Sequence, residues 1–415
     1  MNKSAFLCSG QGSQYQGMGR ELVAESPAAA AVLDEASDAL GLDMRSLCFD
    51  SSAEELARTA NTQPAVLTLS VAQARVSRER EGLTPAVIAG HSLGEITALT
   101  LAGAFSFADA VRLARRRGEL MQDAVPEGRG MMLAVRTRDH REVADICAET
   151  AERSSEVVQI SNYNSNTQVV VAGHRDAVLS VHEQADELGM QSTPLNVSVP
   201  FHCPLMGPVV EPLRAELESI AISEPEVPVL SNVTGEPYGS AEEIIDLLTR
   251  QVVEPVRWTD NQHWMRLHGI VFGVEFGPRQ TLRNLMRSTH REIPVFSYDI
   301  GSDRADLQTM IERTTIPYVA RVLGLIVAAR NENFDAADYQ QRVAEPYRKL
   351  EKLSRTIDRE ERAATAEECA EAAAAMVGIL RAKGSSESDV QERLDRLAAD
   401  TRSERLTADA FPAHA

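Results

Sequence analysis

The chain has 415 residues, of which 43% are hydrophobic, so it is long enough for two or three units with buried cores. Asp and Glu number 61 against 42 Lys and Arg, and this negative charge argues against non-specific nucleic-acid binding. The five cysteines are scattered without a C-x-x-C pair, which indicates neither a disulfide framework nor a zinc site. There is no signal-peptide pattern and no apolar stretch of membrane-spanning length, so we expect a cytoplasmic protein.

The N-terminal part predicts one short strand followed by helices. The strand is expected at 5–8 and ends in the glycine-containing loop 9–14, which either approaches a ligand or simply connects two elements. The helices are expected at 28–40, 52–57 and 65–78, the last capped by Asn61-Thr62-Gln63-Pro64.

A serine flanked by two glycines follows in Gly90-His91-Ser92-Leu93-Gly94-Glu95, between a strand expected at 86–89 and a helix at 96–102. This is the pattern of a nucleophile elbow, a turn so tight that only hydrogen atoms fit at the glycine positions. The following helix start offers free N–H groups to an anionic intermediate. The alternative is a tight turn without a catalytic role. We predict that Ser92 is a nucleophile.

The next segment, 107–123, predicts a long amphipathic helix that carries Arg112, Arg115, Arg116 and Arg117. Such a run usually forms a solvated basic face. The alternative is that one arginine points inward, because Arg117-Gly118 is followed by apolar residues. A buried guanidinium needs a partner, and its planar, bidentate shape suits a carboxylate.

Between 130 and 200 the pattern is that of a small separate unit. Strands are expected at 131–135, 157–161, 168–172 and 192–197, and helices at 141–152 and 176–188, with an Asn-rich turn at 162–166. The order β-α-β-β-α-β is the ferredoxin-like arrangement. We therefore predict a small ferredoxin-like domain inserted in a larger one.

His202 lies where the chain leaves this insert, in a loop bracketed by Pro200 and Pro204 that stiffens its backbone. A nucleophilic serine needs a general base, and most of the other histidines look like surface positions. We predict that His202 is this base. The alternative is a hydrogen-bonded structural histidine.

The larger domain resumes after the insert. Strands at 227–231, 270–276 and 295–298 alternate with helices at 209–219 and 241–252, which predicts a mostly parallel sheet covered on both faces. From about 301 the pattern becomes helical, although 323–327 is a strand-like run. An apolar stripe from Tyr339 to Ile357, the Ala-rich 363–382 and the segment 388–399 predict helices, with a disordered tail from Thr401. We expect docking or dimerisation here rather than a second active site.

Seven of these motifs together resemble the malonyl-CoA:acyl-carrier-protein transacylases, including the free-standing acyltransferases that serve polyketide synthases. The resemblance covers about residues 4–300 and is carried by Gly10-Gln11-Gly12-Ser13-Gln14, Thr62-Gln63-Pro64, Gly90 to Glu95, Arg117-Gly118, Asn162-Tyr163-Asn164-Ser165, Phe201-His202 and Ser231-Asn232-Val233-Thr234-Gly235. Three positions depart from the family pattern, namely Ser9, Ile96 and Arg279.

The resemblance implies a role for nine residues. Ser92 forms the acyl-enzyme, His202 is the base, the Gln11 and Leu93 amides form the oxyanion hole, Arg117 clamps the malonyl carboxylate, Phe201, Gln63 and His91 bind substrate, and a backbone carbonyl near Gln251 orients His202. The aromatic Phe201 resembles the malonyl-selective pattern. No bound metal or cofactor is implied, because malonyl-CoA is a substrate and the phosphopantetheine belongs to the carrier.

The implied fold class is an α/β-hydrolase-like large domain with an inserted ferredoxin-like domain and a C-terminal helical extension. We expect the core at 1–128 and 201–300, the insert at 129–200 and the extension at 301–415. The expected function is malonyl transfer from malonyl-CoA to an acyl carrier protein. Alternatives are a hydrolase that clears stalled carriers, transfer of another carboxylated unit such as methylmalonyl, or a non-catalytic scaffold. Arg115, Arg116, Arg283 and Arg287 are candidates for contact with the acidic carrier.

Overall fold

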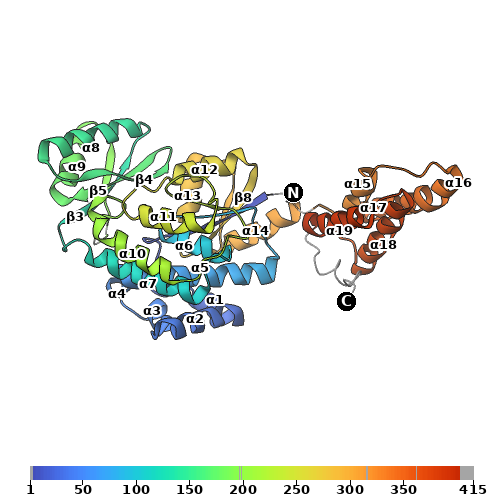
Figure 1. Ribbon diagram of the computed structural model, residues 1–415, viewed down its shortest axis with the longest axis horizontal. Coiled ribbons are helices and arrows are strands. Elements are labelled where there is room, and N and C mark those ends of the chain that lie inside the picture. Colours follow the sequence, from blue (N-terminus) through green and yellow to red (C-terminus); the bar gives the residue numbers. More distant parts are fainter. Residues whose placement is uncertain (1–2, 196, 198, 315, 361, 402–415) are drawn as a thin grey trace. The chain divides into compact units, whose positions relative to one another are not determined.

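The computed structural model describes residues 3–195, 197, 199–314, 316–360 and 362–401 (Figure 1). The chain divides into two compact units, one from Lys3 to Leu307 and one that begins at Gln308. Each unit has buried hydrophobic clusters of its own. In the described part of the chain, no helix combines the length and apolarity needed to cross a bilayer.

A five-stranded sheet forms the centre of the first unit. Its strands are β1 (Lys3–Cys8), β2 (Val87–Gly90), β7 (Val229–Leu230), β8 (Ile270–Phe276) and β9 (Val295–Ser297). They pair in the order β7-β2-β1-β8-β9, and every pair is parallel. Because parallel strands end at the same edge, the loops after β1 and β2 meet above the carboxyl end of the sheet.

Helices cover both faces of this sheet. Those of the first unit are α1 (Arg20–Glu25), α2 (Pro27–Leu40), α3 (Met44–Phe49), α4 (Ala53–Ala57), α5 (Thr59–Glu81), α6 (Leu93–Leu101), α7 (Phe107–Asp123), α10 (Gly207–Ser219), α11 (Ala241–Gln251), α12 (Trp258–Leu267) and α13 (Thr281–Thr289), with the short η1 (Pro204–Met206). On one face Leu7 and Val87 pack with Trp258 of α12 and Met286 of α13. The parallel sheet predicted from the sequence is therefore confirmed.

A separate antiparallel sheet is formed by β3 (Gly130–Arg136), β4 (Val158–Ser165), β5 (Gln168–His174) and β6 (Gln191–Pro194), in the order β4-β5-β3-β6. Helices α8 (His140–Ser154) and α9 (Arg175–Glu187) share its hydrophobic core. The predicted order of elements is confirmed. A bridge from Asn162 to Val256 joins this sheet to the segment before α12.

Several local predictions are wrong. The expected cap Asn61 to Pro64 lies inside α5, where Pro64 removes one backbone bond, and the Ala60 carbonyl that this bond would have used accepts from Arg115 at 3.2 Å. Of the expected Asn-rich turn at 162–166, residues 162–165 belong to β4, which takes them up through two register shifts against β5, and the turn itself lies at 166–167. Helices α12 and α13 were not expected from the sequence.

The second unit is helical. Its elements are α15 (Tyr318–Val327), α16 (Ala336–Tyr339), the π-turn η2 (Gln340–Ala344), α17 (Glu345–Arg359), α18 (Ala366–Ala382) and α19 (Glu387–Thr401), and α14 (Gly301–Thr314) spans the division between the units. The strand-like run at 323–327 is therefore helix, which buries Val322, Leu325 and Ile326 in the unit's core. The predicted disordered tail lies, beyond Thr401, outside the described residues.

We expect residues 1–314 to fold as a separate chain, because the hydrophobic core of the helical unit is built within 318–397 and the clusters around the two sheets within 5–295. Circular dichroism of this shortened chain should show a cooperative thermal transition. A non-cooperative melt of the shortened chain, with a cooperative melt of the full chain, would contradict this expectation.

Candidate active site

Ser92 stands at the turn between β2 and α6 with a φ of 54°. This positive φ is unusual for a residue other than glycine and marks a strained turn. A methyl group on Gly90 would overlap the backbone of Gly94, and one on Gly94 would overlap the carbonyl of Cys8. The turn is therefore as tight as the sequence pattern predicts, because β1, β2 and α6 meet there without space for side chains.

The Ser92 hydroxyl lies 2.7 Å from Nε2 of His202, and Nδ1 of His202 lies 2.7 Å from the carbonyl oxygen of Gln251. A carbonyl only accepts, so Nδ1 carries the proton and Nε2 is free to accept from Ser92. His202 also has a positive φ, 60°, in its loop between Pro200 and Pro204. Strain at both residues is typical of a functional site.

The His202 imidazole is held in its neutral form. Burial lowers its pKa, and the nearby positive charge of Arg117 lowers it further, to about 3. A neutral imidazole with Nε2 facing a hydroxyl has the protonation state of a general base.

Arg117 is the buried member of the arginine run on α7, with 2% of its surface exposed. Its guanidinium donates to the side-chain oxygens of Gln63 at 3.0 Å and Gln251 at 2.8 Å, and to the Ser92 hydroxyl at 3.2 Å. Burial lowers its pKa to about 10, so it stays charged at neutral pH. All three acceptors are neutral. No carboxylate forms an ion pair with this guanidinium among the described residues; Glu95, which the Gln251 amide joins to Arg117, is a charge near enough to raise its pKa.

The amides of Gln11 and Leu93 lie in the loop after β1 and at the first position of α6. The Ser92 N–H is already used, because it donates to Oδ1 of Asn232 at 2.7 Å. Among the residues that the structure describes, the Gln11 and Leu93 N–H groups have no acceptor, so both are available to a ligand. Their role as an oxyanion hole stays a prediction.

The loop that carries Gln11 is fixed from below by a buried carboxylate. Ser9 donates from its hydroxyl to Glu275 at 2.9 Å, and Glu275 also accepts the N–H groups of Leu282 and Arg283 at the start of α13. Ser9, one of the departures from the family pattern, thus ties the loop after β1 to α13.

A cavity of about 240 Å³ opens beside the serine. Seven of the predicted site residues line it: Gln11, Gln63, His91, Ser92, Arg117, Phe201 and His202. The other two predicted site residues, Leu93 and Gln251, are buried and do not line this cavity. His91 turns its Nε2 towards Oδ1 of Asn164 at 2.8 Å, so its ring is held against the antiparallel sheet rather than towards His202. Within the described residues, no three His, Cys, Asp or Glu side chains are grouped to hold a metal ion.

Residues 5–329 match the family model described as "Acyl transferase domain". The chain is 36% identical over 376 residues to a malonyl CoA-acyl carrier protein transacylase of Bacillus subtilis, covering 89% of this chain and 93% of the relative. The chain belongs to the acyl transferase family. A second transacylase of the same name, from Escherichia coli K12, is 44% identical over 288 residues, which cover 69% of this chain and 93% of the relative.

Solved structures of this family have the same mixed α/β fold. The transacylase of Coxiella burnetii has a TM-score of 0.73 and 37% identity, with 75% of this chain and 98% of that chain covered. A type II PKS acyl-carrier protein in complex with its malonyl-transacylase gives a TM-score of 0.71 and 38% identity, covering 74% and 99%.

Two buried residues of this acyl transferase site were not singled out from the sequence. Asn232 donates to the Gly90 carbonyl at 2.7 Å while it accepts from Ser92, and so holds both sides of the turn. Glu95 accepts from the Gln251 side chain at 2.6 Å and from the Asn232 N–H at 3.2 Å, and burial raises its pKa to about 7. Both residues stand in motifs that carry the family resemblance, but only the fold shows that these motifs are in contact.

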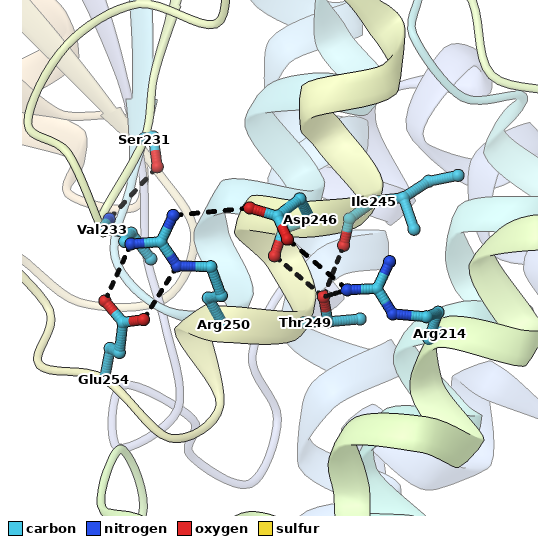
Figure 2. A network of polar contacts seen from close by, with 8 residues as sticks. All are labelled: Arg214, Ser231, Val233, Ile245, Asp246, Thr249, Arg250 and Glu254. Atoms are coloured by element: carbon cyan, nitrogen blue, oxygen red, sulfur yellow. Dashed lines mark hydrogen bonds and ion pairs between the residues drawn. The ribbon is translucent and has the colours of Figure 1, made fainter.

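Gln251 ends α11, and exposed ion pairs hold this helix end at the surface (Figure 2). Arg250 pairs with Glu254 at 2.8 Å and with Asp246 at 3.4 Å, and Arg214 of α10 lies 3.5 Å from Asp246. Exposed pairs of this kind each contribute roughly 0–1 kcal/mol. The buried contacts of Gln251 with His202, Ser92 and Glu95 are therefore the main restraint on this helix end.

The four arginines expected to meet a carrier differ in their surroundings. Arg115 pairs with Glu119 at 2.8 Å, Arg116 with Glu216 at 3.2 Å, and Arg283 with Asp303 at 3.1 Å. Arg287 is exposed on α13. Three of the four therefore already have a carboxylate partner.

We expect the His202 ring to stay neutral far below its ordinary titration range. Its folded pKa of about 3 lies below the unfolded value of 6.5, so the stability that it contributes is complete above pH 6.5 and is lost as the pH falls towards 3. Nitrogen NMR of labelled histidine should show no His202 titration between pH 5 and 8. A midpoint near 6.5, absent from His202→Gln, would contradict the neutral base.

Proposed function

We propose that this acyl transferase moves a malonyl group from malonyl-CoA to the phosphopantetheine thiol of an acyl carrier protein, through an acyl-enzyme on Ser92. The observation that carries the proposal is the buried Arg117, without a direct ion-pair partner in the described chain, beside the Ser92–His202 pair. The names of the relatives, and the carrier complex of one structural neighbour, support the same reaction.

In the first half-reaction His202 takes the Ser92 proton on Nε2 while the serine oxygen attacks the thioester carbonyl. The Gln251 carbonyl steadies the imidazolium through Nδ1, 2.7 Å away. The N–H groups of Gln11 and Leu93 receive the oxyanion, and one such donor typically contributes about a hundredfold to a thousandfold in rate. His202 then returns the proton to the leaving CoA sulfur, and the malonyl ester stays on Ser92.

In the second half-reaction the carrier's phosphopantetheine thiol replaces CoA. His202 removes the thiol proton, the sulfur attacks the ester, and the proton returns to the Ser92 oxygen as the ester bond breaks. The enzyme alternates between free and acylated forms, which predicts ping-pong kinetics. The proposed reaction uses no bound metal or cofactor.

The charge of Arg117 would select the acyl group. A malonyl carboxylate can replace the amide oxygens of Gln63 or Gln251 as a bidentate partner for the guanidinium. An acetyl group cannot, and it leaves a buried charge unpaired, at a cost on the order of 3 kcal/mol. The buried ring of Phe201 lines the same cavity and leaves less room for a methyl branch.

We also propose a finer description of the fold. The parallel sheet with its serine turn supports an α/β-hydrolase-like core from 1–128 and 201–300, and the strand order β4-β5-β3-β6 supports a ferredoxin-like insert at 129–200. A helical extension would follow at 301–415. The five free, buried cysteines support a reducing, cytoplasmic location.

Malonyl-CoA should add one malonyl group to the wild-type chain and none to Ser92→Ala. Intact-protein mass spectrometry, with and without a holo-carrier protein, measures the malonyl adduct on the enzyme and on the carrier, and so follows both half-reactions. Movement of the adduct to the carrier would establish transfer. Release of free malonate with the carrier unloaded would indicate a hydrolase, and no adduct from malonyl-CoA or methylmalonyl-CoA would contradict an acyl-enzyme.

Arg117→Ala should lower kcat/KM for malonyl-CoA by about a hundredfold or more, because it removes the carboxylate partner, and should raise the relative activity with acetyl-CoA. Steady-state acylation with both donors measures this. Arg112→Ala is the matched control, since Arg112 is an exposed arginine on the same helix. Equal losses with the two donors would rule out a carboxylate clamp.

A further inference from the structure

A second, polar groove of about 440 Å³ adjoins the acyl cavity. Its walls come from the end of β3, the β4–β5 turn and α13, which packs against β4 (Figure 1). Gln168 and Leu285 line both the groove and the acyl cavity, so the two spaces are neighbours.

The groove has a positive side formed by Arg136 and Arg138. Both side chains are exposed, and neither makes an ion pair or a side-chain hydrogen bond with another described residue. Other exposed arginines of the described chain, such as Arg141 and Arg175, also lack an ion pair, but Arg136 and Arg138 differ from them in lining one groove. Two free guanidinium groups at a concave surface attract an anion.

The opposite side is lined with hydroxyl and amide groups. Thr167 and Ser288 lie 2.8 Å apart through their hydroxyl oxygens, with Ser165 3.4 Å from Ser288, and Asn284 lies exposed beside them. Hydroxyl and amide donors together with guanidinium groups are the partners that phosphate oxygens take in proteins.

The groove is also connected to the serine turn by hydrogen bonds. Gln168 accepts from Asn164 at 3.2 Å, and Asn164 lies 2.8 Å from His91, the residue before Ser92. A thioester seated at Ser92 must send the rest of its donor out of the acyl cavity. The groove is a neighbouring space with the charge to receive it.

We propose that the groove formed by Arg136, Arg138, Thr167 and Ser288 binds the phosphate of the phosphopantetheine arm. This inference rests on the proposed function, because CoA and the holo-carrier share that arm and differ beyond its phosphate. One site would then orient the arm in both half-reactions, with the thiol end at Ser92.

The test compares acylation of Ser92 by malonyl-CoA and by malonyl-pantetheine, which has the same arm without phosphate. In R136Q/R138Q the preference for malonyl-CoA, measured as the ratio of the two kcat/KM values, should fall at least about tenfold, because two charge-assisted hydrogen bonds are lost. The control R141Q/R175Q removes the same charge from exposed positions on α8 and α9 and should keep the wild-type preference.

A second measurement uses the holo-carrier as the acceptor. Its kcat/KM as acceptor should fall by a similar factor in R136Q/R138Q. If kcat/KM fell with malonyl-CoA and stayed unchanged with the holo-carrier, the shared phosphate site would be overturned, because only the nucleotide of CoA would then contact these arginines. An unchanged preference, or equal losses with both donors, would overturn it as well. Failure of the wild-type chain to acylate with either donor would overturn the proposed function, and this inference with it.

Discussion

The close approach of three backbones at Ser92 is the constraint on which the site depends. The turn after β2 packs against the end of β1 and the start of α6 with no room for a methyl group at Gly90 or Gly94. This packing holds Ser92 at a positive φ that the isolated turn would not favour. Asn232 closes the arrangement by bonding both sides of the turn, so a residue 140 positions away restrains the nucleophile.

The second determining feature is a buried positive charge. Arg117 sits among neutral acceptors, and burial together with the Arg117 charge lowers the pKa of His202, which keeps the base in its neutral form. A fully buried cation with neutral partners is costly for folding. Its position against the Ser92 hydroxyl means that a carboxylate entering the cavity would relieve part of that cost. The charge of Arg117 would then contribute both to substrate selection and, beside burial, to the neutral state of the base.

The helical unit after Leu307 is built on a core of its own. The Bacillus subtilis relative covers 89% of this chain, which an alignment can reach only by extending into that unit, whereas the relative from Escherichia coli K12 covers 69%. The helical unit therefore has a counterpart in one transacylase and lies beyond the matched part of another. The residues around Ser92 therefore belong to the part of the chain that both relatives match, and the helical unit does not.

The sequence by itself determined the elements whose pattern is local. The serine turn, the amphipathic α7 with its arginines, and the order of strands and helices in the antiparallel unit follow from glycine placement and from periods of 2 and 3.6 residues. Only the tertiary structure decided which distant residues come into contact. The Ser9 hydroxyl, in the loop after β1, meets Glu275 of β8 over 266 positions, and the side chains of Glu95 and Gln251 meet over 156 positions. Asn162 to Ser165 read as a turn yet form a strand, because pairing with β5 outweighs local preference. Local propensity depends on neighbouring residues, but burial and long-range hydrogen bonding depend on which surfaces the whole chain brings together.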